Sequence, residues 1–252
     1  MKINLLFMYY LLCLKGIKHK ITYMLWINDF ISLVYPKICA ACGNSLWVHE
    51  KVICTFCDFH LPKTNYHQIS ENPVSKLFQG RANIYSASAY LFFHKGSKVQ
   101  QLVHQLKYKG RKDVGVYLGN SYGQVLLQSP LFIEIDLIVP VPLHPKKLMK
   151  RGYNQSDQFG VGLSESMKIP MNNQVLIRCR SNETQTKKAR FKRWENVDNI
   201  FMVKNPDALK GKKILLVDDV ITTGATLESC INALSAIPEV RISIVAIAAA
   251  LR

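Results

Sequence analysis

The sequence predicts an α/β fold: a parallel sheet with helices on both faces, preceded by a small metal-binding module. In the second half of the chain, short apolar runs alternate with helical segments, as in parallel sheets with right-handed crossovers. The runs DLIVPV at 136–141 and KILLV at 213–217 are continuously apolar, like strands buried on both faces. Four closely spaced cysteines near the start of the chain indicate a metal site.

Composition and charge narrow the class of protein. The chain has 252 residues, enough for one sizeable domain and a small appendage, and its 48% apolar and 20% charged residues exclude disordered and fibrous classes. There are 33 Lys and Arg against 17 Asp and Glu, giving a net charge of +16. Such an excess attracts polyanions: nucleic acid, an anionic membrane surface or a phosphate-rich small ligand.

The first 23 residues are treated as an extension. The apolar stretch 3–14 is followed by the basic run 15–20. It is too short for a membrane span, which needs about 20 residues, and it lacks the layout of a secretory signal. A short amphipathic anchor and a translation start at Met24 both remain open. We expect a cytoplasmic protein with no integral membrane span, and peripheral contact at the inner membrane stays open.

Three regions are expected: the extension 1–23, a helix and cysteine module at 24–66, and the main domain at 80–252, with 67–80 as a linker. Pro36 ends the first helix, 24–35. Helices are expected at 97–108, 114–128, 147–167 and 224–235. Strands are expected at 82–93, 136–141, 174–177, 200–203, 213–217 and 240–248. Residues 178–196 form a long loop without periodicity.

The cysteine module has the spacing C-x2-C-x11-C-x2-C, formed by Cys39, Cys42, Cys54 and Cys57. Each CxxC turn offers two thiolates to one metal, and two such turns close a tetrahedral site. Four protein ligands leave no position for water, so we predict a structural Zn²⁺. A redox dithiol is the competing interpretation, although it usually needs a single CxxC at a helix start.

The segment 214–226, ILLVDDVITTGAT, combines a strand, two acids and a helix start. Asp218 and Asp219 at the strand end can accept hydrogen bonds from ribose hydroxyls and help to retain a hydrated Mg²⁺. Backbone N–H groups at the helix start attract a phosphate, and Gly224 lets the chain close around it. The predicted anion loop consists of Thr222, Thr223, Gly224, Ala225 and Thr226. The whole string resembles the signature of type I phosphoribosyltransferases, which implies binding of 5-phosphoribosyl pyrophosphate.

Two basic segments accompany this loop. The first, PLHPKKLMKRGYNQ at 142–155, follows a strand and carries Lys147 and Arg151, whose charges suit a pyrophosphate leaving group. The second, 178–196, interleaves cations with Phe191 and Trp194, which permits base stacking as well as phosphate contact. Two roles remain open for this second segment: it covers the bound sugar phosphate, or it contacts nucleic acid. The predicted nucleic-acid residues are Lys187, Lys188, Arg190, Lys192 and Arg193.

In this order, VPVPLHPKKLMKRGYNQS, TQTKKARFKRWENV and ILLVDDVITTGATLESC resemble the ComF family, including relatives of the GntX type. The resemblance covers roughly residues 25–252 and extends to a zinc ribbon ahead of the transferase domain. It implies that Asp218, Asp219 and the anion loop bind phosphoribosyl pyrophosphate. It places Arg151, Asn154 and Gln155 at the same cleft. Members of this family are implicated in the uptake of single-stranded DNA during natural transformation.

Three functions follow from these residues. One is a phosphoribosyltransferase with an unidentified acceptor, for which Asp218 and Asp219 are weak catalytic candidates. Another is a single-stranded DNA-binding accessory that works with the DNA-uptake machinery. The third is a sensor that binds phosphoribosyl pyrophosphate without chemistry. The sequence contains a predicted binding loop for the ligand and no recognisable pocket for an acceptor. It therefore predicts binding and leaves catalysis open.

Overall fold

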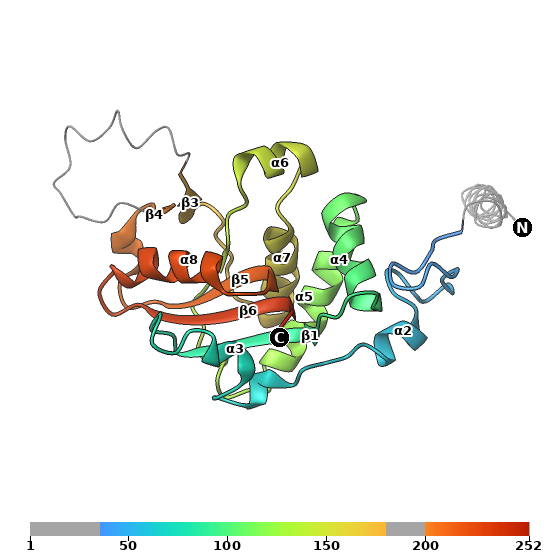
Figure 1. Ribbon diagram of the computed structural model, residues 1–252, viewed down its shortest axis with the longest axis horizontal. Helices are drawn as coiled ribbons and strands as arrows, with labels where there is room; N and C mark the ends of the chain where they lie inside the picture. The colour runs from blue at the N-terminus through green and yellow to red at the C-terminus, as the bar shows by residue number, and fades with distance from the viewer. Residues whose placement is uncertain (1–35, 180–199, 252) are drawn as a thin grey trace, which may run out of the picture.

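The computed structural model describes residues 36–179 and 200–251 (Figure 1). The expected helix at 24–35 and the extension 1–23 lie outside the described residues, as does most of the predicted basic loop. Within the described part no helix combines the length and apolarity that a membrane crossing requires.

The main domain is built on a four-stranded sheet in the order β1-β6-β5-β2. Its strands are β1 (Ser86–Phe92), β2 (Leu137–Pro140), β5 (Lys213–Ile221) and β6 (Arg241–Ala249). All three pairings are parallel. Residues 214–217 of β5 and all of β6 after Arg241 are buried, which explains their continuous apolar sequence. The predicted parallel sheet is confirmed.

Helices cover both faces of this sheet, as predicted. Successive side chains of a strand point to opposite faces, so Leu215 and Val217 face one core while Ile214 and Leu216 face the other. The first core contains α5 (Lys112–Leu126) and α7 (Gln155–Met167), and α4 (Lys98–Tyr108) packs beside them. The second contains α8 (Ala225–Ser235).

Glycines bring α5 and α7 into close contact. A Cβ added to Gly119 would overlap the carbonyl oxygen of Phe159, and one added to Gly162 would overlap that of Val116. The two helices therefore approach backbone to backbone, and this fixes the start of α7 relative to the sheet.

Two sequence predictions about element bounds are wrong. The expected helix 147–167 is two helices, α6 (Pro145–Arg151) and α7, because Gly152 adopts a left-handed conformation with φ of 75°. The strand expected at 213–217 runs on to Ile221, since its pairing with β6 continues as far as Ile221 opposite Ala249. Asp218 and Asp219 are thus part of the strand, near its carboxyl end.

The expected strands at 174–177 and 200–203 are β3 (Leu176–Arg178) and β4 (Phe201–Val203). They pair with each other in an antiparallel two-stranded sheet and not with the main sheet. They flank residues 180–199, and the described residues on either side lie next to each other, with the Cys179 amide donating to the Ile200 carbonyl at 2.8 Å (Figure 1). The short 3₁₀ helix η2 (Pro206–Leu209) connects β4 to β5.

The segment expected to be a linker, 67–80, is packed against the main domain. It contains η1 (Tyr66–Gln68) and α3 (Pro73–Lys76), and both Val74 and Phe78 are fully buried in the core that holds α8. Asn72 caps α3 and also donates a hydrogen bond of 2.7 Å to the carbonyl of Ala87 in β1. The polar residues of the segment 67–80 thus serve helix caps and turns that pack on the domain, and the segment is not a free linker.

The cysteine module lies beside α4 and α5, drawn in blue at one side of Figure 1, and includes α2 (Thr55–Phe59). Val52, Ile53 and Leu61 belong to the same core as α5 and α7. After the module, the chain runs antiparallel to β1, with Lys63 opposite Leu91. The module is therefore attached to the domain through apolar packing and, just after it, one antiparallel β-bridge to β1.

Candidate functional site

The loop between β5 and α8 forms a small pocket at the carboxyl end of the sheet. Its volume is about 40 Å³, and every lining residue lies between Asp218 and Leu227. Thr222, Thr223, Ala225 and Thr226 are exposed there. Gly224 begins α8 with φ of 75°, and no side chain caps the helix start at this position. The first-turn amides are thus available to an anion, and the pocket suits one small anion better than a nucleobase.

Residues 77–81 support this loop from outside the predicted motif. A Cβ added to Gly224 would come within 3.1 Å of Phe78 Cζ, so the ring lies directly against the glycine. Arg81 donates a hydrogen bond of 3.1 Å to the Thr223 carbonyl and forms an ion pair with Glu228 in α8. Phe78 lies in the segment 67–80 that was expected to be a linker, and Arg81 follows directly after it, so neither was predicted to contact the loop. Nothing in its local pattern indicates a partner more than 140 residues away.

Asp218 and Asp219 lie at the mouth of the same loop, and both are half-buried. Ser156 Oγ donates to Asp218 Oδ1 at 3.1 Å, and the Asp219 amide donates to the same oxygen at 2.8 Å. Lys107 Nζ lies 3.0 Å from Asp219 Oδ1. Burial, together with the neighbouring charge of Asp219, raises the pKa of Asp218 to about 7. The pair can therefore hold a proton near neutral pH, a property that clusters at functional sites.

Lys107 is the second residue that sequence reasoning missed. It sits in the last turn of α4, and its side chain is 20% exposed against 16% for Asp219. Such a partly buried pair keeps a positive charge next to the acids. Lys107 lies in the helix expected at 97–108, and the helical pattern alone does not show that its last turn brings a cation to the predicted site.

The RGYNQ segment forms the turn between α6 and α7. Asn154 caps α7 by accepting from the Ser156 amide and donates 2.9 Å to the Val141 carbonyl. Gln155 is completely buried and accepts from Arg151 Nη1 at 2.6 Å. Both side chains hold the turn beside Ser156 and Asp218. Their predicted contact with a ligand at the cleft stays a prediction.

Lys147 and the other lysines of α6 remain exposed, and α6 buries none of its residues. This helix projects from the body at the top of Figure 1. Arg151, at its end, is half-exposed. The predicted nucleic-acid residues Lys187, Lys188, Arg190, Lys192 and Arg193 lie outside the described residues, and their prediction stays untested.

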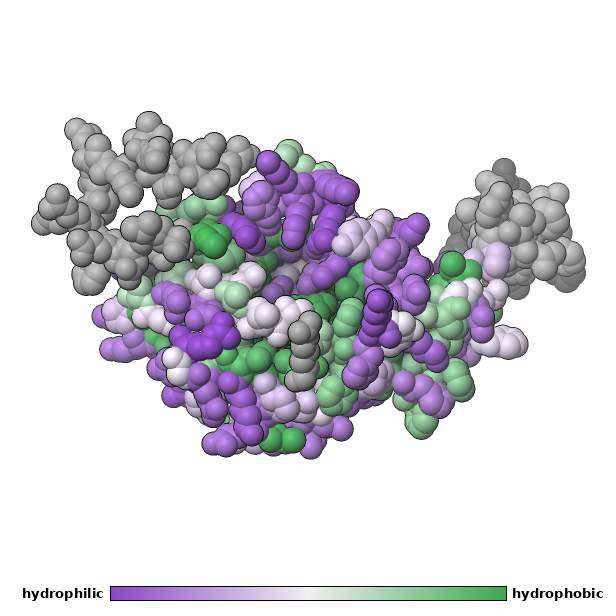
Figure 2. All heavy atoms as spheres, viewed as in Figure 1, coloured by the Kyte–Doolittle hydropathy of each residue, from purple (hydrophilic) through white to green (hydrophobic). Residues whose placement is uncertain are grey.

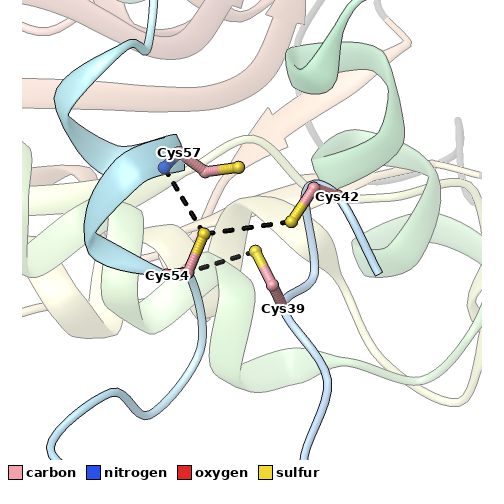
Figure 3. Close-up of side chains that lie close together, drawn as sticks. All are labelled: Cys39, Cys42, Cys54 and Cys57. Atoms are coloured by element: carbon pink, nitrogen blue, oxygen red, sulfur yellow. Dashed lines mark hydrogen bonds between the residues drawn. The ribbon is translucent and has the colours of Figure 1, made fainter. Parts of the chain in front are cut away.

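The four predicted metal ligands converge (Figure 3). The sulfur atoms of Cys39, Cys42, Cys54 and Cys57 all lie within 4.8 Å of one another. The Cys42 and Cys54 sulfurs are 3.8 Å apart, the spacing of about 3.8 Å that four Zn–S bonds of about 2.3 Å impose on a tetrahedron. The donor set and geometry fit zinc.

Backbone amides donate hydrogen bonds to two of these sulfurs. Cys39 Sγ accepts from the Ala41 and Cys54 amides, and Cys54 Sγ accepts from the Cys57 amide. Burial acts to raise the pKa of Cys39, but the donated N–H groups outweigh it and lower the pKa to about 7. Among the residues that the structure describes, this is the one cluster of three or more such ligands.

The chain is similar in sequence to known proteins. A phosphoribosyl transferase domain family model matches residues 158–251. The chain is 38% identical over 203 residues to competence protein ComFC of Bacillus subtilis, covering 80% of this chain and 79% of that protein. The chain belongs to the ComF family. It is also 27% identical to the DNA utilization protein YhgH of Escherichia coli, over 78% of this chain and 83% of that protein.

Among solved structures, the chain is similar to a purine phosphoribosyltransferase from Pyrococcus horikoshii. The two share 20% identity over 58% of this chain and 86% of that protein, with a TM-score of 0.32. The phosphoribosyltransferase-type fold of this ComF member rests on the family match and on its parallel strand order.

Proposed function

We propose that this ComF family member binds 5-phosphoribosyl pyrophosphate with Mg²⁺ in the loop between β5 and α8. The observation that carries the proposal is the juxtaposition of an acid pair and an anion-sized pocket. Asp218 contributes to the pocket lining and lies directly before the exposed threonines of the anion loop. Hydroxyl recognition by carboxylates and phosphate recognition by amides are thus adjacent, as a ribose 5-phosphate requires.

Each part of such a ligand has a matching group. The 5-phosphate would sit against the start of α8, and the ribose hydroxyls would reach Asp218 and Asp219. Mg²⁺ would neutralise the pyrophosphate, with these two carboxylates as the available oxygen ligands. Lys147 and Arg151 supply positive charge on the α6 side. Lys107, paired with Asp219, adds a cation at the same edge.

We further propose that the protein acts in the cytoplasm in DNA uptake, through contact with single-stranded DNA. The names of its relatives, competence protein and DNA utilization protein, support this role, as does its net charge of +16. A metabolic phosphoribosyltransferase and a sensor without chemistry remain the alternative functions.

Titration calorimetry tests the binding proposal. Wild-type protein with Mg²⁺ should release or take up heat with phosphoribosyl pyrophosphate, and Asp218→Asn/Asp219→Asn should lose most of that affinity. Asp207→Asn in the distant η2 helix is the matched control and should bind like the wild type. Absence of both heat and thermal protection for the wild type would refute the proposal. Pyrophosphate release with a panel of bases and amines then separates a transferase from a sensor.

A further inference from the structure

A basic surface continues from the acid pair across the outside of the domain. It consists of residues 107–113, from the end of α4 into α5, and residues 146–151 of α6; we call it the α4/α6 surface. These two segments contain eight basic residues and one acidic residue. In Figure 2 hydrophilic residues gather at the top of the view, where Figure 1 places α6.

Three contacts join the two halves of the α4/α6 surface. The Arg151 guanidinium lies 5.2 Å from the centre of the Tyr108 ring, and Lys112 Nζ lies 5.1 Å from that of Tyr153. The Tyr153 hydroxyl donates to the Leu106 carbonyl at the end of α4. The cations are therefore presented by two docked elements in a defined arrangement.

Most of the charge on this surface is uncompensated. Arg111 pairs with Asp113 through hydrogen bonds of 2.8 to 3.1 Å, and Lys107 forms an ion pair with Asp219. Within the described part of the chain, the other basic residues of the surface form no ion pair. They are Lys109, Lys112, Lys146, Lys147, Lys150 and Arg151. A seven-residue helix such as α6 is about 10 Å long, so the surface can contact several successive phosphates.

Tyr108 adds an aromatic platform to these cations. Its side chain is 60% exposed although Arg151 and His104 both contact the ring. An exposed aromatic ring between phosphate-binding cations is the arrangement on which unpaired bases stack. Duplex DNA keeps its bases stacked inside the helix and cannot offer one to Tyr108, and a phospholipid headgroup carries no aromatic ring to stack on it.

We propose that single-stranded DNA binds the α4/α6 surface, with its phosphates on Lys109, Lys112 and the α6 lysines and one base stacked on Tyr108. This inference deepens the DNA-contact part of the proposed function. It assigns that contact to residues other than the 187–193 cluster that the sequence singled out. It does not depend on binding of phosphoribosyl pyrophosphate, which calorimetry measures separately.

Fluorescence anisotropy with the full chain and a labelled oligothymidylate of about 20 nucleotides at low salt tests the proposal. Tyr108→Ala should weaken binding about 5- to 20-fold, and Tyr108→Phe should retain it because the ring remains. Lys109→Ala/Lys112→Ala should lower the salt slope by about 1.4, since each single-strand phosphate contact contributes about 0.7. A duplex of the same length should bind with no dependence on Tyr108.

Lys210→Ala/Lys212→Ala is the matched control, because both lysines are exposed near the start of β5, at the opposite end of that strand. It should change neither affinity nor slope. Unchanged affinity in both Tyr108→Ala and Lys109→Ala/Lys112→Ala would overturn the proposal, as would an equal loss in the control. If the wild type ignores phosphoribosyl pyrophosphate but Tyr108→Ala still loses DNA affinity, the sugar-phosphate proposal alone fails.

Discussion

Lys107 and Asp219 lie 112 residues apart in the chain and form an ion pair of 3.0 Å between α4 and β5. The pair joins the two principal features of this protein. Asp219 belongs to the predicted sugar-phosphate loop, and Lys107 begins the α4/α6 surface. Any ligand that draws Lys107 away from Asp219 changes the charge next to Asp218, so the acids and the basic surface are electrostatically linked.

We expect Lys107→Met to destabilise the protein by about 1–3 kcal/mol at pH 8, because it leaves the Asp219 carboxylate partly buried and unpaired beside Asp218. Lys107→Arg retains a cation and should recover most of the loss. Urea unfolding at fixed ionic strength measures both. Equal free energies of unfolding for Lys107→Met and wild type would show that the pair contributes nothing to stability.

Asp218→Asn should stabilise the unliganded protein at pH 8 while weakening phosphoribosyl pyrophosphate binding. The folded-state pKa of Asp218 is about 7, above the value of about 3.9 for an unfolded Asp. The folded state therefore holds the extra proton between these values, and this carboxyl makes stability fall as pH rises from about 4 to about 7.

In Asp218→Asn the side-chain amide cannot ionise. The free energy of unfolding at pH 8 should therefore rise by about 1–3 kcal/mol, after allowing for partial exposure. The side-chain amide can still accept hydrogen bonds from Ser156 and the Asp219 amide. Urea unfolding at pH 4 and pH 8 should show a gain confined to the higher pH. A gain of the same size at both pH values would contradict the assignment to ionisation of Asp218.

Gly224→Ala should destabilise the protein more than Gly96→Ala. Both glycines have left-handed backbones, with φ of 75° and 79°, so both substitutions carry a conformational cost of about 1–2 kcal/mol. Only the Cβ at 224 would press on Phe78, since nothing lies within 4 Å of one at 96. Thermal denaturation should show this difference, and Phe78→Leu combined with Gly224→Ala should shrink it. Equal losses at 224 and 96 would show that Phe78 does not constrain the loop.

Purified protein should contain about one zinc, and Cys42→Ser should lose it. Because Cys39 and Cys57 share a core with α5 and α7, metal loss should lower the melting temperature of the whole chain and not only of the module. Cys179→Ser is the control and should keep the metal. Metal analysis measures the content, and less than about half an equivalent in the wild type would contradict a closed site.

Short-range chemistry in the sequence predicts several parts of this protein. Continuous apolar runs such as ILLV, alternating with helical segments, are typical of strands buried on both faces and predicted the parallel sheet. The cysteine spacing fixed which sulfurs could meet, because each CxxC turn is local. The DDVITTGAT string specified acids, glycine and hydroxyls in the order that the loop uses. These features depend on neighbours within about a dozen residues.

The distant residues that complete the loop are brought to it by packing. Phe78 lies in a polar stretch that was expected to be a linker, Arg81 follows it, and the role of both depends on docking against α8. Lys107 reaches Asp219 because α4 packs beside α5 and directs its last turn to the sheet edge. Gln155 is buried by the turn that Gly152 creates. Side-chain contacts between segments a hundred or more residues apart arise from packing, and the local pattern of neither segment contains them.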